Sequence, residues 1–383
     1  MDLTSFLRAM AAKGASDMFF TCGAPVQMKV EGKMHALGDT PLPASMTQSV
    51  AYTLMSDKQI AQFERDLEMN FAVAVEGSGR FRVNVFKQKG EVGMVIRAIK
   101  TEIPGFGELK LPPVLQDIIM AKRGLVLVVG STGSGKSTTL ASMIDYRNSI
   151  SGGHILTIED PIEFIHPHKK CIVNQREVGV DTHAFSNALK NAMREAPDVI
   201  LIGEILDAAT MEAAIAFAET GHLCLATLHS NSADQTIERI LNFFPETAHK
   251  NILMNVALNL KAVVSQRLVI GTSGKRLPAV EVMLNTPMIR ELLRKGHVHE
   301  VKEAMEKSLS DGMQTFDQHL FQLAKRGEIT EETAIAVSDS PDGLSLKFKL
   351  SEGHSGEHDP YATQEQGPPP PPGLLAGSSA YDF

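Results

Sequence analysis

Short apolar runs with strand-like spacing fill the first hundred positions of the chain. Strands are predicted at residues 18–21, 26–30, 71–75, 80–86 and 93–99. The Gly77-Ser78-Gly79 turn separates two of these runs and Lys89-Gly90 separates two more, as expected for antiparallel strands joined by short loops. The first ten residues have the spacing of an amphipathic helix. Together these patterns predict a small α+β domain at residues 1–104.

The pattern changes after residues 105–113, where prolines and glycines predict a linker or hinge. Beyond it, strands predicted at 124–129, 154–158, 199–202 and 223–228 alternate with helices predicted from Lys136 and over 207–219. Such alternation predicts an α/β core whose parallel strands carry ligands at their carboxyl ends. Apolar spacing at 252–264, 288–293 and 316–323 predicts helices that cover this core. The second domain is expected to span residues 114–350.

The final segment, residues 351–383, is polar and contains consecutive prolines at 368–372. A segment of this composition cannot bury enough apolar surface to offset the entropy lost on ordering. We therefore expect a disordered, proline-rich tail.

Composition narrows the class of protein. The 383 residues are 43% hydrophobic and 21% charged, as in globular domains. A net charge of -8 provides no overall attraction to phosphate backbones, so no nucleic-acid partner is expected. Three cysteines without a CxxC pair indicate a reducing compartment. No apolar run reaches the roughly 18 residues that span a bilayer. These features predict a cytoplasmic protein that reaches a membrane only through a partner.

A phosphate-binding loop lies between a predicted strand and a predicted helix. The sequence GSTGSGKS from Gly130 to Ser137 fits the Walker A pattern in full. Its glycines let backbone N–H groups face phosphates, Lys136 would neutralise β and γ charge, and the Ser137 hydroxyl would ligate Mg²⁺. The predicted cofactors are therefore ATP and Mg²⁺. The flanking strand and helix disfavour the alternative, a chance glycine-rich turn. The predicted nucleotide-binding residues are Ser131, Thr132, Gly133, Ser134, Gly135, Lys136, Ser137 and Thr138.

Polar side chains at strand ends are further candidates. Glu204 follows the strand at 199–202, where a carboxylate that holds a metal belongs, and acidic residues at 159–163 follow the strand at 154–158. Ser137 and Glu204 are the predicted metal ligands, and a solvated turn is the alternative for the carboxylates. His222 and His229 bracket the strand at 223–228 and should point to opposite faces, so they do not share a metal. One of them is a candidate γ-phosphate sensor; the alternative is a buried, hydrogen-bonded histidine.

Four sequence boxes in this order are similar to those of a known family. They are GSTGSGKSTT from Gly130, LTIEDPIEF at 156–164, PDVILIGE at 197–204 and TGHLCLATLHSNSA at 220–233. The chain resembles the type IV pilus retraction ATPases of the secretion ATPase superfamily. Similar segments also occur near Ala15, at 80–99 and from Asp311. The runs AFAETGHLCLATLH and RILNFFPE favour the accessory, PilU-type branch over the principal, PilT-type motors.

The resemblance implies a PAS-like N-terminal domain followed by a RecA-like ATPase domain. It also implies a homohexameric ring with ATP at the subunit boundaries, in which Mg-dependent ATP hydrolysis powers pilus retraction and twitching motility. The implied partners are a PilT-type retraction ATPase and an inner-membrane pilus platform protein, with the chain on the cytoplasmic side of that membrane.

The resemblance also implies roles for individual residues. Glu163 would be the general base, Glu204 would position magnesium and water, and His229 would be catalytic. Arg82 and Arg97 match arginines that the family's N-terminal domain offers to phosphates, and Arg194 matches a position near the nucleotide. A guanidinium suits phosphate oxygens because it stays charged and its planar fork matches them. The alternative for these arginines is a solvated face.

One position departs from the family pattern. Where the family has Gly-Glu-x-Arg-Asp, this chain has Leu206 between Glu204 and Asp207. Leucine supplies neither charge nor hydrogen bond, so either the arginine's contact is lost or position 206 is packed among apolar neighbours. Two functions therefore stay open: an active motor, and a catalytically weak nucleotide-binding protein that reinforces the principal retraction ATPase. A third, a DNA translocase, is disfavoured by the net acidity and by the absence of Trp.

Overall fold

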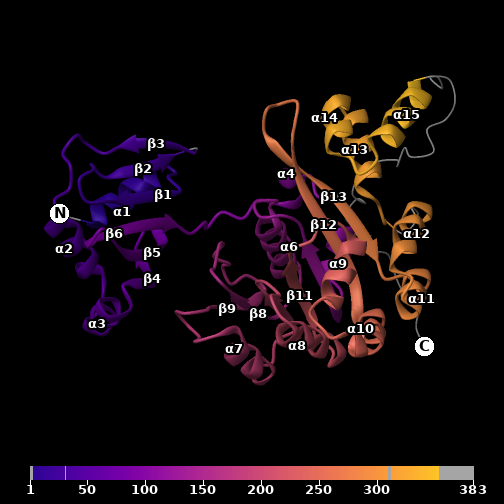
Figure 1. Cartoon of the computed structure of the whole chain (residues 1–383), viewed down its shortest axis with the longest axis horizontal. Helices are drawn as coiled ribbons and strands as arrows, with labels where there is room; N and C mark the ends of the chain where they lie inside the picture. Colours follow the sequence, from indigo (N-terminus) through magenta and orange to yellow (C-terminus); the bar gives the residue numbers. More distant parts are fainter. Residues whose placement is uncertain (1–2, 31, 309–311, 353–383) are drawn as a thin grey trace, which may run out of the picture.

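The computed structural model describes residues 3–30, 32–308 and 312–352. Its N-terminal part is a six-stranded sheet in the order β3-β2-β1-β6-β5-β4, in which every neighbouring pair is antiparallel (Figure 1). The strands are β1 Asp17–Phe20, β2 Gln27–Val30, β3 Lys33–Ala36, β4 Glu68–Val75, β5 Gly79–Gln88 and β6 Glu91–Ala98, and the helices are α1 Leu3–Ala12, α2 Ala44–Leu54 and α3 Asp57–Asp66.

Buried and partly exposed side chains alternate along β5, so one face of this sheet packs against the core. Phe81, Val83 and Val85 are buried in the core of the N-terminal part, so the residues between them face the other side. Arg82 lies on that other face and pairs in register with Arg97 of β6. The turns before and after β5 contain Gly77 and Gly90, both with positive φ, where the sequence predicts hairpin loops.

A second sheet, of seven strands, follows in the order β13-β12-β7-β11-β10-β8-β9. Six strands run parallel and β13 alone pairs antiparallel, with β12. The α/β fold class, with a small antiparallel α+β part before it, is confirmed. The strands are β7 Gly124–Val129, β8 Gly153–Glu159, β9 Cys171–Glu177, β10 Val199–Ile202, β11 Leu223–Leu228, β12 Leu260–Ile270 and β13 Arg276–Leu284.

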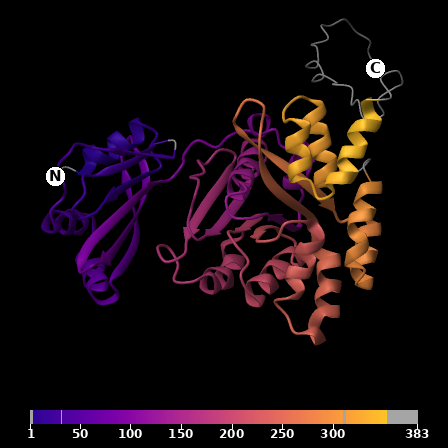
Figure 2. The same cartoon turned by 45° about the horizontal axis from the view of Figure 1, so that its top comes forward.

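Helices cover both faces of the second sheet. Alternate residues of β7 separate the two layers: Leu125 and Leu127 pack in one core with α7 to α12, and Val126 and Val128 pack in another with α4 to α6. Helices α13 to α15 form a third cluster on the outer ends of β12 and β13 (Figure 2). The helices are α4 Phe106–Leu109, α5 Val114–Ile119, α6 Lys136–Ile150, α7 Phe185–Ala192, α8 Ala208–Glu219, α9 Ala233–Leu241, α10 Glu246–Asn259, α11 Pro287–Lys295, α12 Val301–Lys307, α13 Phe316–Lys325, α14 Glu331–Val337 and α15 Pro341–Glu352, with short 3-10 turns at Met193–Glu195 and Val298–Glu300.

The prediction of a helix over residues 252–264 is wrong for residues 260–264. Helix α10 ends at Asn259, and β12 begins at Leu260. Residues 262–266 of β12 are all buried, because the strand lies between β7 and β13 and is covered on both faces. A continuous apolar run of this kind has no period that distinguishes a buried strand from a buried helix.

The structure covers part of what was expected for the C-terminal tail and for membrane-spanning segments. The predicted tail, residues 351–383, lies outside the described residues except for its first two, which end α15. Within the described residues, no helix combines the length and apolar character needed to cross a membrane. The domain limits at 104, 113 and 350 stay predictions.

Candidate functional site

The Walker A loop lies where the sequence predicts it, between the end of β7 at Val129 and the start of α6 at Lys136. Gly130 has a φ of 151°, and a Cβ there would collide with the carbonyl oxygen of Gln266, so only glycine fits. The Lys136 ammonium donates to the carbonyl oxygens of Gly130 at 2.8 Å and Ser131 at 3.0 Å. Burial lowers the pKa of Lys136, and the nearby carboxylates of Glu204 and Glu163 act in the opposite direction.

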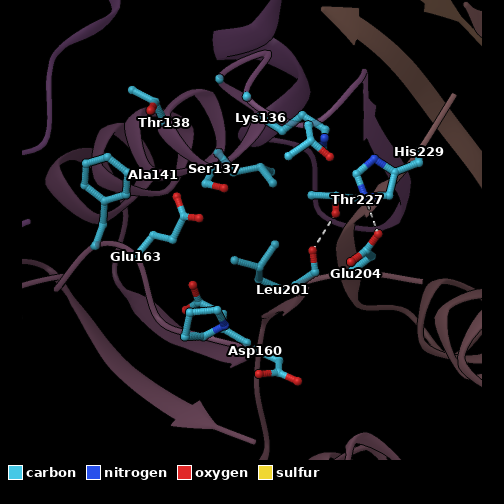
Figure 3. A pocket seen from close by; sticks show the side chains of 18 of the residues that line it. Lys136, Ser137, Thr138, Ala141, Asp160, Glu163, Leu201, Glu204, Thr227 and His229 are labelled. Atoms are coloured by element: carbon cyan, nitrogen blue, oxygen red, sulfur yellow. Dashed lines mark hydrogen bonds and ion pairs between the residues drawn. The ribbon is translucent and has the colours of Figure 1, made fainter. Parts of the chain in front are cut away.

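A cavity of about 400 Å³ opens over this loop (Figure 3). It brings together most of the predicted site from segments far apart in the sequence. Two loop residues, Ser131 and Ser134, do not line it, and Ser134 is buried. The predicted residues that line the cavity are Thr132, Gly133, Gly135, Lys136, Ser137, Thr138, Glu163, Glu204 and His229.

Glu204 and His229 form one side of the cavity. Their closest atoms, Glu204 Oε1 and His229 Nε2, are 2.7 Å apart, and His229 Nδ1 lies 3.4 Å from the carbonyl oxygen of Gly130 (Figure 3). The imidazole therefore contacts both the Walker A loop and the carboxylate. His222 lies at the opposite end of β11 and contacts the carbonyl oxygen of Phe217 at 3.2 Å, outside the cavity lining.

The acidic segment after β8 forms the other side. In Figure 3 the Glu163 carboxylate reaches into the cavity from the side opposite Glu204 and toward Ser137. Glu159 also lines the cavity, but burial raises its pKa to about 7 despite a 2.6 Å hydrogen bond from the Thr157 hydroxyl. A carboxyl that is half protonated near neutral pH is a weaker metal ligand than an ionised one, which leaves Glu204 and Glu163 as the stronger candidates.

The donor set fits Mg²⁺. Ser137, Glu204 and Glu163 present hydroxyl and carboxylate oxygens to one cavity beside the Walker A loop. No cluster of three or more His, Cys, Asp or Glu residues that could hold a metal occurs in the described part of the chain. Mg²⁺ in nucleotide sites is held by one or two protein oxygens together with phosphates and water, so a larger cluster is not required.

The three predicted arginines are not brought to the Walker A loop. Arg82 and Arg97 line a second cavity, of about 880 Å³, which shares Pro161 and Glu163 with the first. Arg97 pairs with Asp17 at 2.8 Å. Arg194 donates to the Asn191 side chain at 3.1 Å and lines neither cavity.

Strands β12 and β13 supply further residues to the site that no sequence motif indicates. Leu268 and Arg276 line the first cavity. Gln266, 2% exposed, donates to the carbonyl oxygen of Ser134 at 2.7 Å and accepts from the Thr139 hydroxyl at 2.7 Å. It thereby ties the second half of the loop that would hold the phosphates to the first turn of α6. A β-branched run around it, AVVSQRLVI, is the signal that could have identified the strand.

The structure shows whether the Leu206 side chain is packed among apolar neighbours. Leu206 is 62% exposed, whereas its neighbour Ile205 is 2% exposed. The interpretation that Leu206 is packed among apolar neighbours is therefore wrong. The side chain does not line the cavity that holds Glu204.

The sequence of this chain matches a known protein family and several of its members. Residues 2–294 match the sequence model described as "Type II/IV secretion system protein". The chain is 52% identical to "Type IV pilus ATPase PilU" of Pseudomonas aeruginosa, over 94% of each chain. It is 43% identical to "Type IV pilus retractation ATPase PilT" of the same organism, over 90% of this chain and 100% of the relative.

A solved structure of a related protein supports the same family. The "Crystal Structure of the Pilus Retraction Motor PilT and Bound ADP" superposes with a TM-score of 0.84 at 41% identity, and the match covers 90% of this chain and 99% of the other. The resemblance inferred from the four boxes is confirmed, and with it the assignment as an ATPase. This chain belongs to the type II/IV secretion ATPase family and, within it, to the PilT/PilU group of type IV pilus retraction ATPases.

Proposed function

We propose that this chain is the accessory, PilU-type motor of a type IV pilus, a homohexamer that hydrolyses Mg-ATP to drive pilus retraction and twitching motility. One observation carries the proposal: Lys136 and Ser137 face Glu163 and Glu204 across a single cavity, so a phosphate chain on the loop would meet both carboxylates. The 52% identity to PilU supports the accessory role.

The residues divide the work of hydrolysis. Backbone N–H groups of residues 131–138 hold the phosphates, and Lys136 balances their charge. Ser137 and Glu204 would hold Mg²⁺, which supplies charge neutralisation at the β and γ oxygens when bound. Glu163, on the opposite side, accepts the proton of the attacking water. His229 holds Glu204 in place and contacts Gly130, which suits a residue that responds to an occupied phosphate site.

The proposal gives the three predicted arginines a role only after the two domains close or the ring assembles. They are Arg82, Arg97 and Arg194. Arg82 and Arg97 line a cavity adjoining Glu163, so a closing motion of residues 1–104 on residues 114–350 would carry them toward the nucleotide. Residues 105–113 would serve as the linker for that motion. Assembly of a ring is a second route by which these arginines, and Arg194, would meet phosphates.

The proposed partners follow from the group to which the chain belongs. They are further copies of this chain, a PilT-type retraction ATPase and a pilus platform protein of the inner membrane, with the chain at the cytoplasmic face. No nucleic-acid partner is proposed, because the net charge is -8.

Phosphate release and native mass, measured on the purified full chain with Mg-ATP, test the proposal. An active motor is expected to turn over at about 1 s⁻¹ or faster and to show the mass of six chains. Ring assembly and ATP binding with turnover at least a hundredfold slower would favour the second function, a weak coupling protein that reinforces the principal motor. Leu206 is the observation that favours that second function.

A Leu206→Arg variant tests the missing arginine. Because the position is 62% exposed, the guanidinium is not buried, and the melting temperature should stay within about 2 °C of wild type. An exposed ion pair with Glu204 or with a neighbouring subunit contributes only about 0.2–1 kcal/mol. Phosphate release or ring stability should therefore rise by no more than about fivefold.

Leu206→Gln is the matched control, since it adds polarity without charge. Equal behaviour of both variants would show that the charge of the family arginine has no role at this position in this chain.

A further inference from the structure

The segment that carries Glu163 is held in place from β9. Residues 175 and 177 are two apart on this strand, so their side chains share one face. Glu177, which is 1% exposed, accepts a 3.3 Å hydrogen bond from the Ile162 amide. Gln175 contacts the same segment on the far side of Glu163. The catalytic candidate thus lies between two attachment points on a single strand.

The side chain of Gln175 makes three hydrogen bonds. Its side-chain amide donates to the carbonyl oxygen of Phe164 at 2.8 Å and to Glu159 Oε1 at 3.3 Å, and its side-chain oxygen accepts from the His166 amide at 2.8 Å. All three partners line the cavity that contains the Walker A loop. Gln175 itself does not line it, so it has no direct access to nucleotide.

The same segment is tied on its other edge to the end of the N-terminal part. The Lys100 amide donates to the Glu163 carbonyl oxygen at 3.3 Å, and the Ile165 amide donates to the Lys100 carbonyl oxygen at 2.9 Å. The Lys100 ammonium lies 5.4 Å from the centre of the Phe164 ring. Gln175 and Lys100 thus hold residues 164–166 from two sides, and the Lys100 connection leads toward residues 1–104.

We propose that Gln175 is the positioning residue of the acidic segment: its amide fixes residues 164–166 so that Glu163 reaches the attacking water. The inference rests on the proposed role of Glu163 as general base. The physical requirement is distance, because a general base must lie within hydrogen-bond reach of the proton it accepts, and a displacement of about 1 Å costs up to about a hundredfold in rate.

The first test combines two substitutions. Gln175→Ala should lower kcat by about 10- to 100-fold while the affinity for a fluorescent ATP analogue and the native mass stay unchanged. In a Glu163→Gln background the same substitution should change turnover less than twofold, because the group it positions is already disabled. An equal loss in both backgrounds would overturn the inference and leave Gln175 with a general structural role.

A second variant tests the role of the Gln175 side-chain amide as a hydrogen-bond donor. Gln175→Glu keeps the size and the acceptor for His166, but an ionised carboxylate cannot donate to Phe164 or to Glu159. Protonation restores a donor, so the ratio of variant to wild-type turnover should rise as the pH falls from 8 to 6. A ratio independent of pH would contradict the role of the amide donor.

Asn174→Ala is the matched control, since Asn174 lies on the opposite face of β9 and contacts His154 at 3.0 Å. It should retain wild-type turnover. Amide exchange of residues 160–168 provides a readout that does not need hydrolysis: it should be faster in Gln175→Ala than in Asn174→Ala. If the wild-type chain shows no turnover, the proposed function fails and amide exchange alone decides whether Gln175 holds the segment; equal exchange in the two variants would overturn the inference.

Discussion

Lys136→Ala is expected to abolish ATP turnover, with a loss of at least about 100-fold. The ammonium is the cationic side chain at the start of α6 that donates to the loop carbonyl oxygens of Gly130 and Ser131, and it lies close enough to Glu204 and Glu163 for both to affect its pKa. Bound phosphates would replace those carbonyl oxygens as its partners. Alanine removes the charge that faces the β and γ phosphates and leaves the loop backbone in place.

Phosphate release with saturating Mg-ATP measures this effect, and circular dichroism checks that the variant folds. Lys122→Ala is a matched control, because Lys122 is exposed and lies outside the cavity lining. Turnover of the Lys136 variant near the wild-type rate would show that the cavity is not the catalytic site.

Glu163→Gln is expected to slow hydrolysis by about 100- to 10,000-fold while ATP still binds. Glutamine has the same shape as glutamate and the side chain is exposed in the cavity, so neither packing nor the hydrogen bonds of the flanking residues should change. The amide, however, cannot accept the proton of the attacking water.

Equilibrium binding of a fluorescent ATP analogue and single-turnover phosphate release separate binding from chemistry. Glu212→Gln, an exposed position on α8 outside the cavity, is the control. Lost nucleotide binding in a folded Glu163 variant would argue instead that Glu163 holds the metal.

Residues that are neighbours along the chain account for what the sequence predicted well. The strand from Gly124 to Val129 and the helix from Lys136 have the predicted positions, since the apolar run, the glycines and the helix start are contiguous. The same holds for Glu204, which is the second residue after β10. Short-range geometry decides such features: a strand leads into a loop, and the loop leads into a helix whose N-terminus faces the ligand.

Contacts between distant segments were decided only by the tertiary structure. Gln266 reaches the Walker A loop from a strand more than a hundred residues away, and Gln175 on β9 reaches Phe164, the residue after Glu163. Neither residue lies in one of the four sequence boxes, and each is one of several polar residues in its strand, so the sequence gives no sign of what either contacts. The buried run from Leu260 was equally ambiguous, because a strand covered on both faces has no polar alternation.

The local sequence did not predict which side chains are exposed to solvent. Leu206 and Ile205 are adjacent aliphatic residues, yet one is 62% exposed and the other 2%. Arg82 and Arg97 match family positions, but the fold places them in a cavity beside Glu163 and not at the Walker A loop. The sequence determined those chemical groups of the site that belong to local motifs, whereas Leu268 and Arg276 were found only in the structure. The packing of two sheets and their helices determined which of those groups meet, because burial and distance depend on the whole chain.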